Sequence, residues 1–156
     1  MLSKGYMVGL TDGEGSFTAY LRPPRAEHGS KSYRVECHYY IKLREDDLLL
    51  IKKIKQFFGV GVISFQKDNR PNHHHCYRYE TTSLKDICEV IIPFFDANPL
   101  EGNKIQDYRL FKKIVRAVVR KEHRTKKGLA RIRGWKSRMH TFGLAEYGKS
   151  VRSASV

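Results

Sequence analysis

Apolar and polar residues alternate along two early segments of the chain. In the first segment, Phe17, Ala19 and Leu21 alternate with polar neighbours, and a period of two is typical of a strand with one buried face. Residues 23–24 are both proline and end this strand, because proline cannot donate to a strand ladder. The alternation resumes over residues 33–43, so the two segments are predicted to pair as a hairpin.

Helices are predicted on both sides of this hairpin. A short helix rich in small residues is predicted at 5–13, and a longer one follows the second strand. Asp46 or Asp47 is suited to cap the start of the second helix, and Gly59 is a natural C-terminal stop. Its apolar positions at helical spacing are Leu50, Ile51, Ile54, Phe57 and Phe58.

The remaining chain predicts a second strand pair and more helices. Strands at about 60–67 and 72–81 flank a turn-forming run at 68–72. Ser83 with Asp86 three residues later resembles a capping box. Helices are predicted at 84–95, 103–122 and 125–139. Strands joined as hairpins imply an antiparallel sheet with helices packed on one face, which is an α+β fold. The prediction is one domain over residues 1–140, with a mobile C-terminal tail at 141–156.

Charge narrows the choice of partner. The 156 residues include 30 Lys and Arg against 16 Asp and Glu, a formal net charge of +14. This excess favours a polyanionic partner, with nucleic acid first and an anionic membrane surface second. We expect a soluble intracellular protein, because no secretory signal or membrane-spanning apolar run is present. Cys37, Cys76 and Cys88 lack CxxC spacing and are predicted to be reduced packing thiols.

The candidate chemistry lies at the N-terminal helix. Gly5, Gly9 and Gly13 are spaced by four, which leaves one helix face bare and open to a second helix, most simply that of another subunit across a two-fold axis. Asp12 and Glu14 lie at the end of this helix. Two-fold pairing would bring two such carboxylates together, an arrangement that suits hard divalent cations such as Mg²⁺. Taken alone, Asp-Gly-Glu-Gly is more typical of an ordinary turn.

The whole segment resembles the signature of the LAGLIDADG homing endonucleases. Residues 7–15 lie in register with that nine-residue motif, and Glu14 replaces one carboxylate with another. The identical positions are Gly9, Leu10, Asp12 and Gly15. Further similarity at 57–61, 91–95 and 104–115 extends the resemblance to about residues 5–138. The resemblance implies an αββαββα fold with a saddle-shaped antiparallel sheet.

The resemblance also implies roles for individual residues. Glu14 and the Gly13 carbonyl would bind the catalytic metal, and Lys104 would lie beside the scissile phosphates. Asp12 would stabilise the helix terminus and the turn. The implied metal is Mg²⁺, with Mn²⁺ substituting and Ca²⁺ supporting binding without cleavage. The dimer interface would include Gly5, Gly9, Leu10, Asp12 and Gly13.

The implied activity is site-specific cleavage of double-stranded DNA. A homodimer, usually encoded by a mobile intron, would cut a long pseudo-palindromic site by metal-assisted phosphodiester hydrolysis. The implied host compartment is a bacterial cytoplasm or an organelle. The polar faces of the strands would enter the major groove, which admits a β-ribbon. The predicted DNA-binding residues are Ser16, Thr18, Tyr20, Arg22, Arg34, Glu36, His38, Tyr40, Lys42, Ser64, Gln66 and Arg78.

Several alternatives stay open from sequence alone. Leu43 stands where the family often has a glutamine, and either Lys42 or Arg44 covers that role or the periphery of the active site differs, with cleavage reduced or absent. A non-catalytic nucleic-acid binder on the same fold, an RNA maturase or a DNA-binding regulator, is the second hypothesis. It would have RNA as a possible partner. The basic residues at 112–138 are either a solvated face or contacts to the phosphate backbone.

The run His73-His74-His75-Cys76 invites a zinc interpretation. Adjacent residues on a strand point to opposite sides, so at most two of the four side chains could face one ion. A strand with polar, DNA-facing side chains is favoured. Its parity stays open: Tyr77 and Tyr79 could be core, which would put His74 and Arg78 outside, or the reverse.

Overall fold

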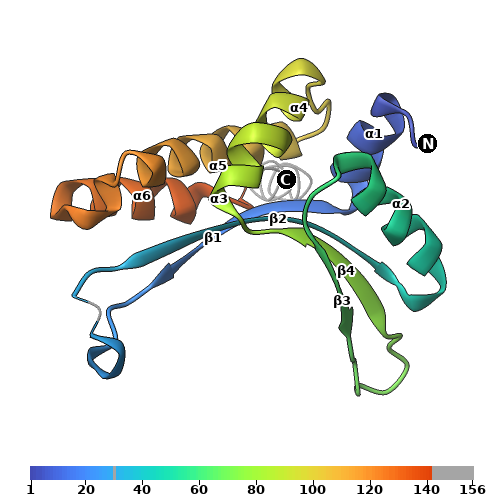
Figure 1. Ribbon diagram of the computed structural model, residues 1–156, viewed down its shortest axis with the longest axis horizontal. Helices are drawn as coiled ribbons and strands as arrows, with labels where there is room; N and C mark the ends of the chain where they lie inside the picture. The colour runs from blue at the N-terminus through green and yellow to red at the C-terminus, as the bar shows by residue number, and fades with distance from the viewer. Residues whose placement is uncertain (30, 142–156) are drawn as a thin grey trace, which may run out of the picture.

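A four-stranded antiparallel sheet forms the centre of the molecule. The computed structural model describes residues 1–29 and 31–141, so the predicted tail lies, apart from Thr141, outside the described residues. The strand order is β1-β2-β4-β3. The strands are β1 (Gly15–Arg22), β2 (Arg34–Arg44), β3 (Val62–Gln66) and β4 (Cys76–Thr81). Figure 1 shows that the sheet is strongly curved, with one concave and one convex side.

The helices lie on the convex side of this arch and leave the concave face uncovered (Figure 1). They are α1 (Lys4–Glu14), α2 (Leu48–Phe58), α3 (Leu84–Asp86), α4 (Ile92–Ala97), α5 (Lys104–Val119) and α6 (Lys126–Arg138). A π-helical segment (Ile87–Ile91) joins α3 to α4, and 3₁₀ turns lie at Ala26–His28, Glu45–Asp47 and Glu122–Arg124. The predicted αββαββα order and the saddle-shaped sheet are therefore confirmed.

Side-chain caps define several helix ends. The Ser3 hydroxyl accepts from the Tyr6 amide at 3.1 Å, and the Ser83 hydroxyl accepts from the Asp86 amide at 3.3 Å, as predicted. Gly59 ends α2 with a φ of +70°, a conformation that glycine adopts without strain. The prediction of an aspartate cap on α2 is wrong in its chemistry. Asp47 holds the N-cap position without a capping hydrogen bond, because the preceding 3₁₀ turn already leads the backbone into the helix.

The second strand pair and helix α5 are shorter than predicted. The second strand pair is shorter than 60–67 and 72–81 because a loop occupies residues 67–75. In this loop the Asp68 amide donates to His75 Nδ1 at 3.0 Å, and Asn72 has a φ of 60°. Helix α5 ends before the predicted residue 122, because Lys121 takes a left-handed φ of 59°.

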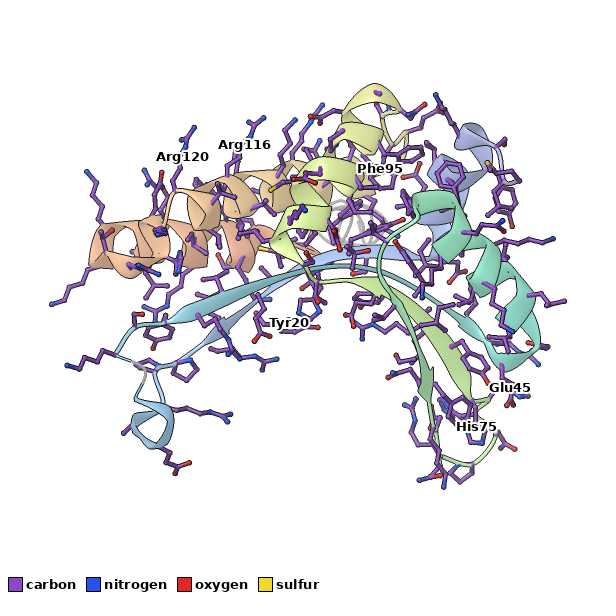
Figure 2. All side chains as sticks on the ribbon, viewed as in Figure 1. Tyr20, Glu45, His75, Phe95, Arg116 and Arg120 are labelled. Carbon is purple, nitrogen blue, oxygen red and sulfur yellow. The ribbon has the colours of Figure 1, made fainter. Side chains whose placement is uncertain are left out.

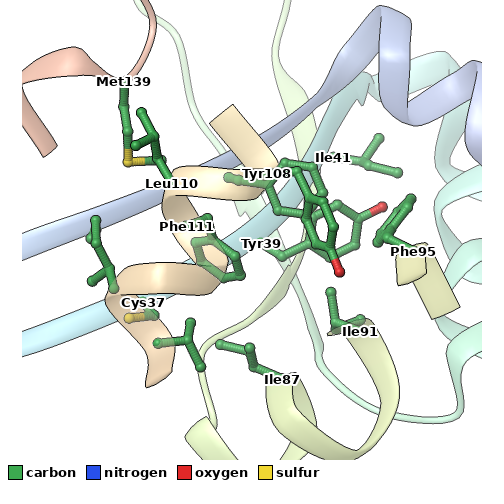
Figure 3. Close-up of a cluster of buried hydrophobic side chains, with 14 of the residues drawn as sticks. Cys37, Tyr39, Ile41, Ile87, Ile91, Phe95, Tyr108, Leu110, Phe111 and Met139 are labelled. Atoms are coloured by element: carbon green, nitrogen blue, oxygen red, sulfur yellow. The ribbon is translucent and has the colours of Figure 1, made fainter. Parts of the chain in front are cut away.

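Aromatic rings fill the core between the convex face of the sheet and the helices. The Phe17 ring lies 5.0 Å from that of Tyr39 and 5.3 Å from those of Phe95 and Phe111. Figure 3 shows Tyr39 of β2 among side chains from α5 and the α3–α4 segment. Because Phe17 and Ala19 are fully buried, the alternate side chains of β1 point to the concave face.

No helix in the described ranges is both long enough and apolar enough to cross a membrane.

Replacing Phe17 with alanine is expected to lower the free energy of unfolding by about 3–5 kcal/mol, the usual cost of emptying a buried phenylalanine site. Phe65 is a matched control, since it lies in β3 and is 49% exposed. Its alanine variant should stay within about 1 kcal/mol of the wild type. Urea unfolding followed by circular dichroism measures both, and equal losses would contradict the assignment of the core.

Candidate metal and nucleic-acid site

Helix α1 passes directly into β1, and the junction leaves one carboxylate free. The Gly15 amide donates to the Thr11 carbonyl, and a Cβ at Gly15 would lie 2.7 Å from Thr11 Cγ2. Only glycine therefore fits this close approach. The side chain of Glu14, immediately before it, is exposed and makes no hydrogen bond or ion pair within the described residues. Its two oxygens are available to a ligand.

Asp12 has a different environment from Glu14. Its Oδ2 accepts from the Glu101 amide at 3.0 Å, and its Oδ1 accepts from the Gly102 amide at 3.2 Å. These bonds tie α1 to the loop that precedes α5. We expected Asp12 to stabilise its own helix terminus, and the structure shows that it holds this distant loop instead. Sequence offered no signal for a contact across about 90 residues.

Lys104 is the first residue of α5 and reaches back to the same junction. Its Nζ donates to the Thr11 carbonyl at 3.0 Å. Burial lowers the pKa of Lys104, and the carboxylates of Asp12, Asp107 and Glu14 oppose that shift. A partly desolvated ammonium group therefore lies within the electrostatic reach of Glu14.

The exposed face of α1 is bare, as its glycine spacing predicts. A Cβ at Gly5, Gly9 or Gly13 would meet nothing within 4 Å. A groove of about 400 Å³ runs beside Gly5 and Gly9. It is lined by Gly5, Val8, Gly9, Asp12, Asn98, Pro99 and Glu101. Leu10, also expected at an interface, is half-buried and packs against the core.

The concave face carries the side chains that were predicted to contact DNA. Pairing of β1 with β2 places Ser16 beside Tyr40, Thr18 beside His38, Tyr20 beside Glu36, and Arg22 beside Arg34. Across β2, β4 and β3, one row contains Lys42, Arg78 and Ser64. Gln66 follows Ser64 on the same face of β3 and donates to its hydroxyl at 3.0 Å. Figure 2 shows Tyr20 on this side of the sheet. Thr18 differs from its neighbours, since it is only 6% exposed.

The parity of β4, left open by the sequence, is settled by burial. Tyr79 is fully buried, so Arg78 lies on the concave face. His74 lies outside β4, in the loop before it, and strand parity does not apply to it. Leu43 is half-buried against the core. Its neighbour Arg44 forms an ion pair with Asp46 at 3.3 Å.

Two glutamates organise the cations of the concave face. Glu36 pairs with Arg22 at 3.2 Å and with Arg34 at 2.7 Å. Burial alone would raise the pKa of Glu36, but these two arginines outweigh it and lower the pKa. Glu80 was missed by sequence reasoning, although it shares a face with Arg78 two residues away.

Glu80 joins two of the predicted DNA-binding residues. One of its oxygens lies 2.7 Å from His38 Nδ1 and also accepts from the Arg78 guanidinium. The same guanidinium lies 3.6 Å above the Tyr40 ring, and its Nε has no hydrogen-bond partner within the described residues. Arg78 is therefore held in one orientation, with its Nε buried.

The donor set restricts which metal could bind. Within residues 1–29 and 31–141, no three His, Cys, Asp or Glu side chains cluster closely enough to hold an ion. His75 Nδ1 is occupied by the Asp68 amide, and burial raises the pKa of the Cys37 thiol to about 12. The Glu14 carboxylate and the Gly13 carbonyl are oxygen ligands, which suit Mg²⁺ or Ca²⁺. One copy of α1 supplies only part of such a site.

Asp12 and Glu14 are expected to respond differently to truncation. Asp12→Ala should lower the free energy of unfolding by about 1–2 kcal/mol, because two backbone amides lose a charged acceptor. Glu14→Ala should stay within about 0.5 kcal/mol, because its carboxylate has no partner to lose. Chemical denaturation of both variants measures the difference. A larger loss for Glu14 than for Asp12 would overturn this assignment of roles.

Comparison with known proteins identifies similar sequences. A family model described as LAGLIDADG endonuclease matches residues 7–115. The chain is 34% identical over 127 residues to a probable intron-encoded endonuclease 2 of Neurospora crassa, covering 81% of this chain and 25% of that protein. It is 33% identical to an uncharacterized 50.9 kDa protein in ND4 intron 1 of Podospora anserina, covering 80% of this chain and 26% of that protein. The chain thus spans about a quarter of these curated relatives.

Solved structures have the same fold. I-SmaMI, bound to an uncleaved DNA target in the presence of calcium ions, superposes with a TM-score of 0.80 at 31% identity. The match covers 90% of this chain and 46% of that one. The homing endonuclease I-TnaI has a TM-score of 0.76 at 26% identity, and the match covers 97% of both chains.

Proposed function

The chain belongs to the LAGLIDADG endonuclease family, and on this premise we propose that it cuts double-stranded DNA at a long pseudo-palindromic site. The observation that carries the proposal is the free Glu14 carboxylate. It lies at the junction of α1 and β1, and Lys104 is anchored to the same junction through the Thr11 carbonyl. An acid and a cation held at one junction are groups that phosphodiester hydrolysis needs.

The residues of this site would divide the work of hydrolysis. Glu14 and the Gly13 carbonyl would hold a divalent cation, Mg²⁺ or Mn²⁺ for cleavage and Ca²⁺ for binding alone. A cation bound there would supply Lewis-acid stabilisation of the charge that develops on phosphate. Lys104 would stabilise the same charge or orient the attacking water. Asp12 would act indirectly, since it holds the loop from which α5 and Lys104 begin.

The concave face would read the DNA. Tyr40 and Glu80 hold the Arg78 guanidinium in place on this face, and a fixed arginine suits the acceptor atoms of guanine in the major groove. Two α1 helices, one from each copy, would pack through Gly5, Gly9 and Gly13. The open glycine face and the groove beside it support this homodimer. Each copy would then act on one strand.

A non-catalytic nucleic-acid binder is the second candidate. Leu43 favours it, because an apolar, half-buried side chain stands where a glutamine would reach the water network of the active site. The two candidates would share the nucleic-acid interface, with RNA in place of DNA for a maturase, and only the first would cleave the strands.

Glu14→Gln is expected to reduce cleavage by more than about a hundredfold while leaving DNA binding intact, because the amide is a poorer metal ligand of the same shape. The assay incubates both proteins with a randomised duplex library in Mg²⁺ and sequences the bound and cleaved molecules in parallel. Ca²⁺ replaces Mg²⁺ as the condition for binding without scission.

The outcomes of this assay separate the two candidates. Cleavage of one pseudo-palindrome by the wild type, lost in the variant, supports the endonuclease. Selective binding without scission by the wild type moves the protein to the non-catalytic class. Lys85→Gln is a matched control, since this lysine lies on α3, outside the candidate site and the concave face; its cleavage should match the wild type.

Gly9→Leu tests the proposed dimer. A Cβ at Gly9 would meet nothing within 4 Å in one copy, and leucine favours helix over glycine by up to about 1 kcal/mol, so the folded chain should keep or gain stability. The same side chain would separate two helices packed through their glycines. Sedimentation velocity should show weaker association of the variant, with an unchanged melting temperature or a higher one. Unaltered association would remove α1 from the interface.

A further inference from the structure

The positive charge of the chain is concentrated away from the concave face. Residues 104–138 contain fourteen Lys or Arg and only two acids, Asp107 and Glu122, a net +12 of the total +14. The four strands together carry five Lys or Arg against Glu36 and Glu80. Most of the attraction for a polyanion therefore comes from α5, α6 and their connection.

Part of this charge does reach the sheet. The Arg133 guanidinium lies 4.7 Å from the centre of the Tyr33 ring, and Lys136 Nζ lies 5.4 Å from that of Tyr20. Both side chains come from α6 and flank the first hairpin. They are placed to contact the same DNA as the concave face.

A second group of cations has no such contact. Arg109, Lys113, Arg116 and Arg120 follow one another at intervals of four, three and four residues, so they share one face of α5 and its C-cap. All four are exposed. We call this group the α5 stripe. Figure 2 shows Arg116 and Arg120 projecting on the side of the molecule opposite Tyr20 and the concave face.

Neighbouring acids leave most of the stripe unneutralised. Asp96 is paired with Lys112 at 2.6 Å, and the contact of Arg120 with Glu122 is long, at 3.9 Å. The helix dipole favours cations at the C-terminal end of α5, which accounts for Arg116 and Arg120 alone. The dipole does not account for Arg109 and Lys113, which lie further from that end.

A groove of about 570 Å³ adjoins the stripe. Its basic lining residues are Arg109, Lys112, Lys113, Arg116 and Arg138, with Asp96 as the acid. The rings that form its floor, Phe95 and Tyr108, are only 1% and 3% exposed. They offer no surface for stacking a nucleobase. The surface therefore suits phosphate groups of a backbone and not unpaired bases.

We propose that the α5 stripe binds the phosphate backbone of a second DNA duplex segment while the concave face holds the first. The proposal rests on the proposed function, because that function makes DNA the polymer held nearby. One short stretch of duplex cannot serve both faces, since DNA has a persistence length of about 50 nm and does not turn back around a small domain. A second contact would let the protein pass between segments while it searches for its site.

The experiment uses the full chain on a bead-bound duplex of random sequence in Ca²⁺. After excess protein is washed away, a second, labelled duplex is offered and its capture is measured. The test variant is Lys113→Ala, Arg116→Ala and Arg120→Ala together. The matched control is Lys52→Ala, Lys53→Ala and Lys55→Ala, three exposed lysines of α2 that remove the same charge elsewhere.

The stripe variant is expected to hold the first duplex normally but to capture the second about tenfold less. The slope of log K for capture against log salt concentration should be shallower by about 2.7, because three phosphate contacts are lost. The α2 control should capture as the wild type does. Capture unchanged in the stripe variant, or lost equally in the control, overturns the proposal. Displacement by an RNA duplex at lower concentration than by DNA reassigns the surface to RNA and also overturns it.

Failure of the proposed function has a separate readout. A wild type that does not retain the first duplex contradicts the concave interface itself. Loss of the first duplex in a combined Arg22→Ala, Arg34→Ala and Arg78→Ala variant supports that interface, whatever the α5 stripe does. Capture that survives in the stripe variant shows that another surface bridges the two duplexes and overturns the role of α5.

Discussion

Thr11 joins the elements on which the candidate site depends. Its hydroxyl is hydrogen-bonded to the Tyr39 hydroxyl at 2.8 Å, which anchors the end of α1 in the core. Its carbonyl accepts from the Gly15 amide and from Lys104 Nζ. Thr11 is fully buried, so none of these groups has water as a substitute partner. The positions of Glu14 and Lys104 relative to each other follow from this one residue.

The same junction explains why a half-buried lysine is tolerated. Burial disfavours the ammonium form and lowers the pKa of Lys104, while Asp12, Asp107 and Glu14 favour it. A hydrogen bond to the Thr11 carbonyl and the charges of three acids therefore offset part of the cost of desolvating Lys104. Asp12 serves twice, because it also fixes the loop before α5 through two backbone amides. Glu14 alone is left without a hydrogen bond, which is the condition a metal ligand requires.

The sequence predicted the parts of this architecture that depend on local pattern. Phe17 and Tyr39 alternate with polar neighbours, so the faces of β1 and β2 follow from a period of two. The parity of β4 could not be predicted, because Tyr77 and Arg78 are both amphipathic and only burial of Tyr79 decides between them. Glu80 was missed as well, because its place on the concave face depends on the same undecided orientation of β4.

The contacts of Thr11 and Asp12 had no local signal. They join residues 28 and about 90 positions apart, and no hydrophobic period encodes such distances. The role of Glu14 was inferred from family resemblance, because its tetrapeptide alone is typical of a turn. Local pattern thus predicted the scaffold, and tertiary contacts determine how the site is held on it.

The division of charge in the molecule separates two tasks of DNA recognition. On the concave face, Glu36 and Glu80 hold arginines in fixed orientations, and this pairing reduces their net attraction for phosphate. Fixed donors suit base edges, where geometry determines specificity, whereas unpaired cations suit phosphates, where charge determines affinity. The unpaired cations lie mainly on α5 and α6. A surface built this way gives up some affinity at the reading face, where Arg133 and Lys136 of α6 add charge beside the first hairpin, while the α5 stripe carries charge on the opposite side.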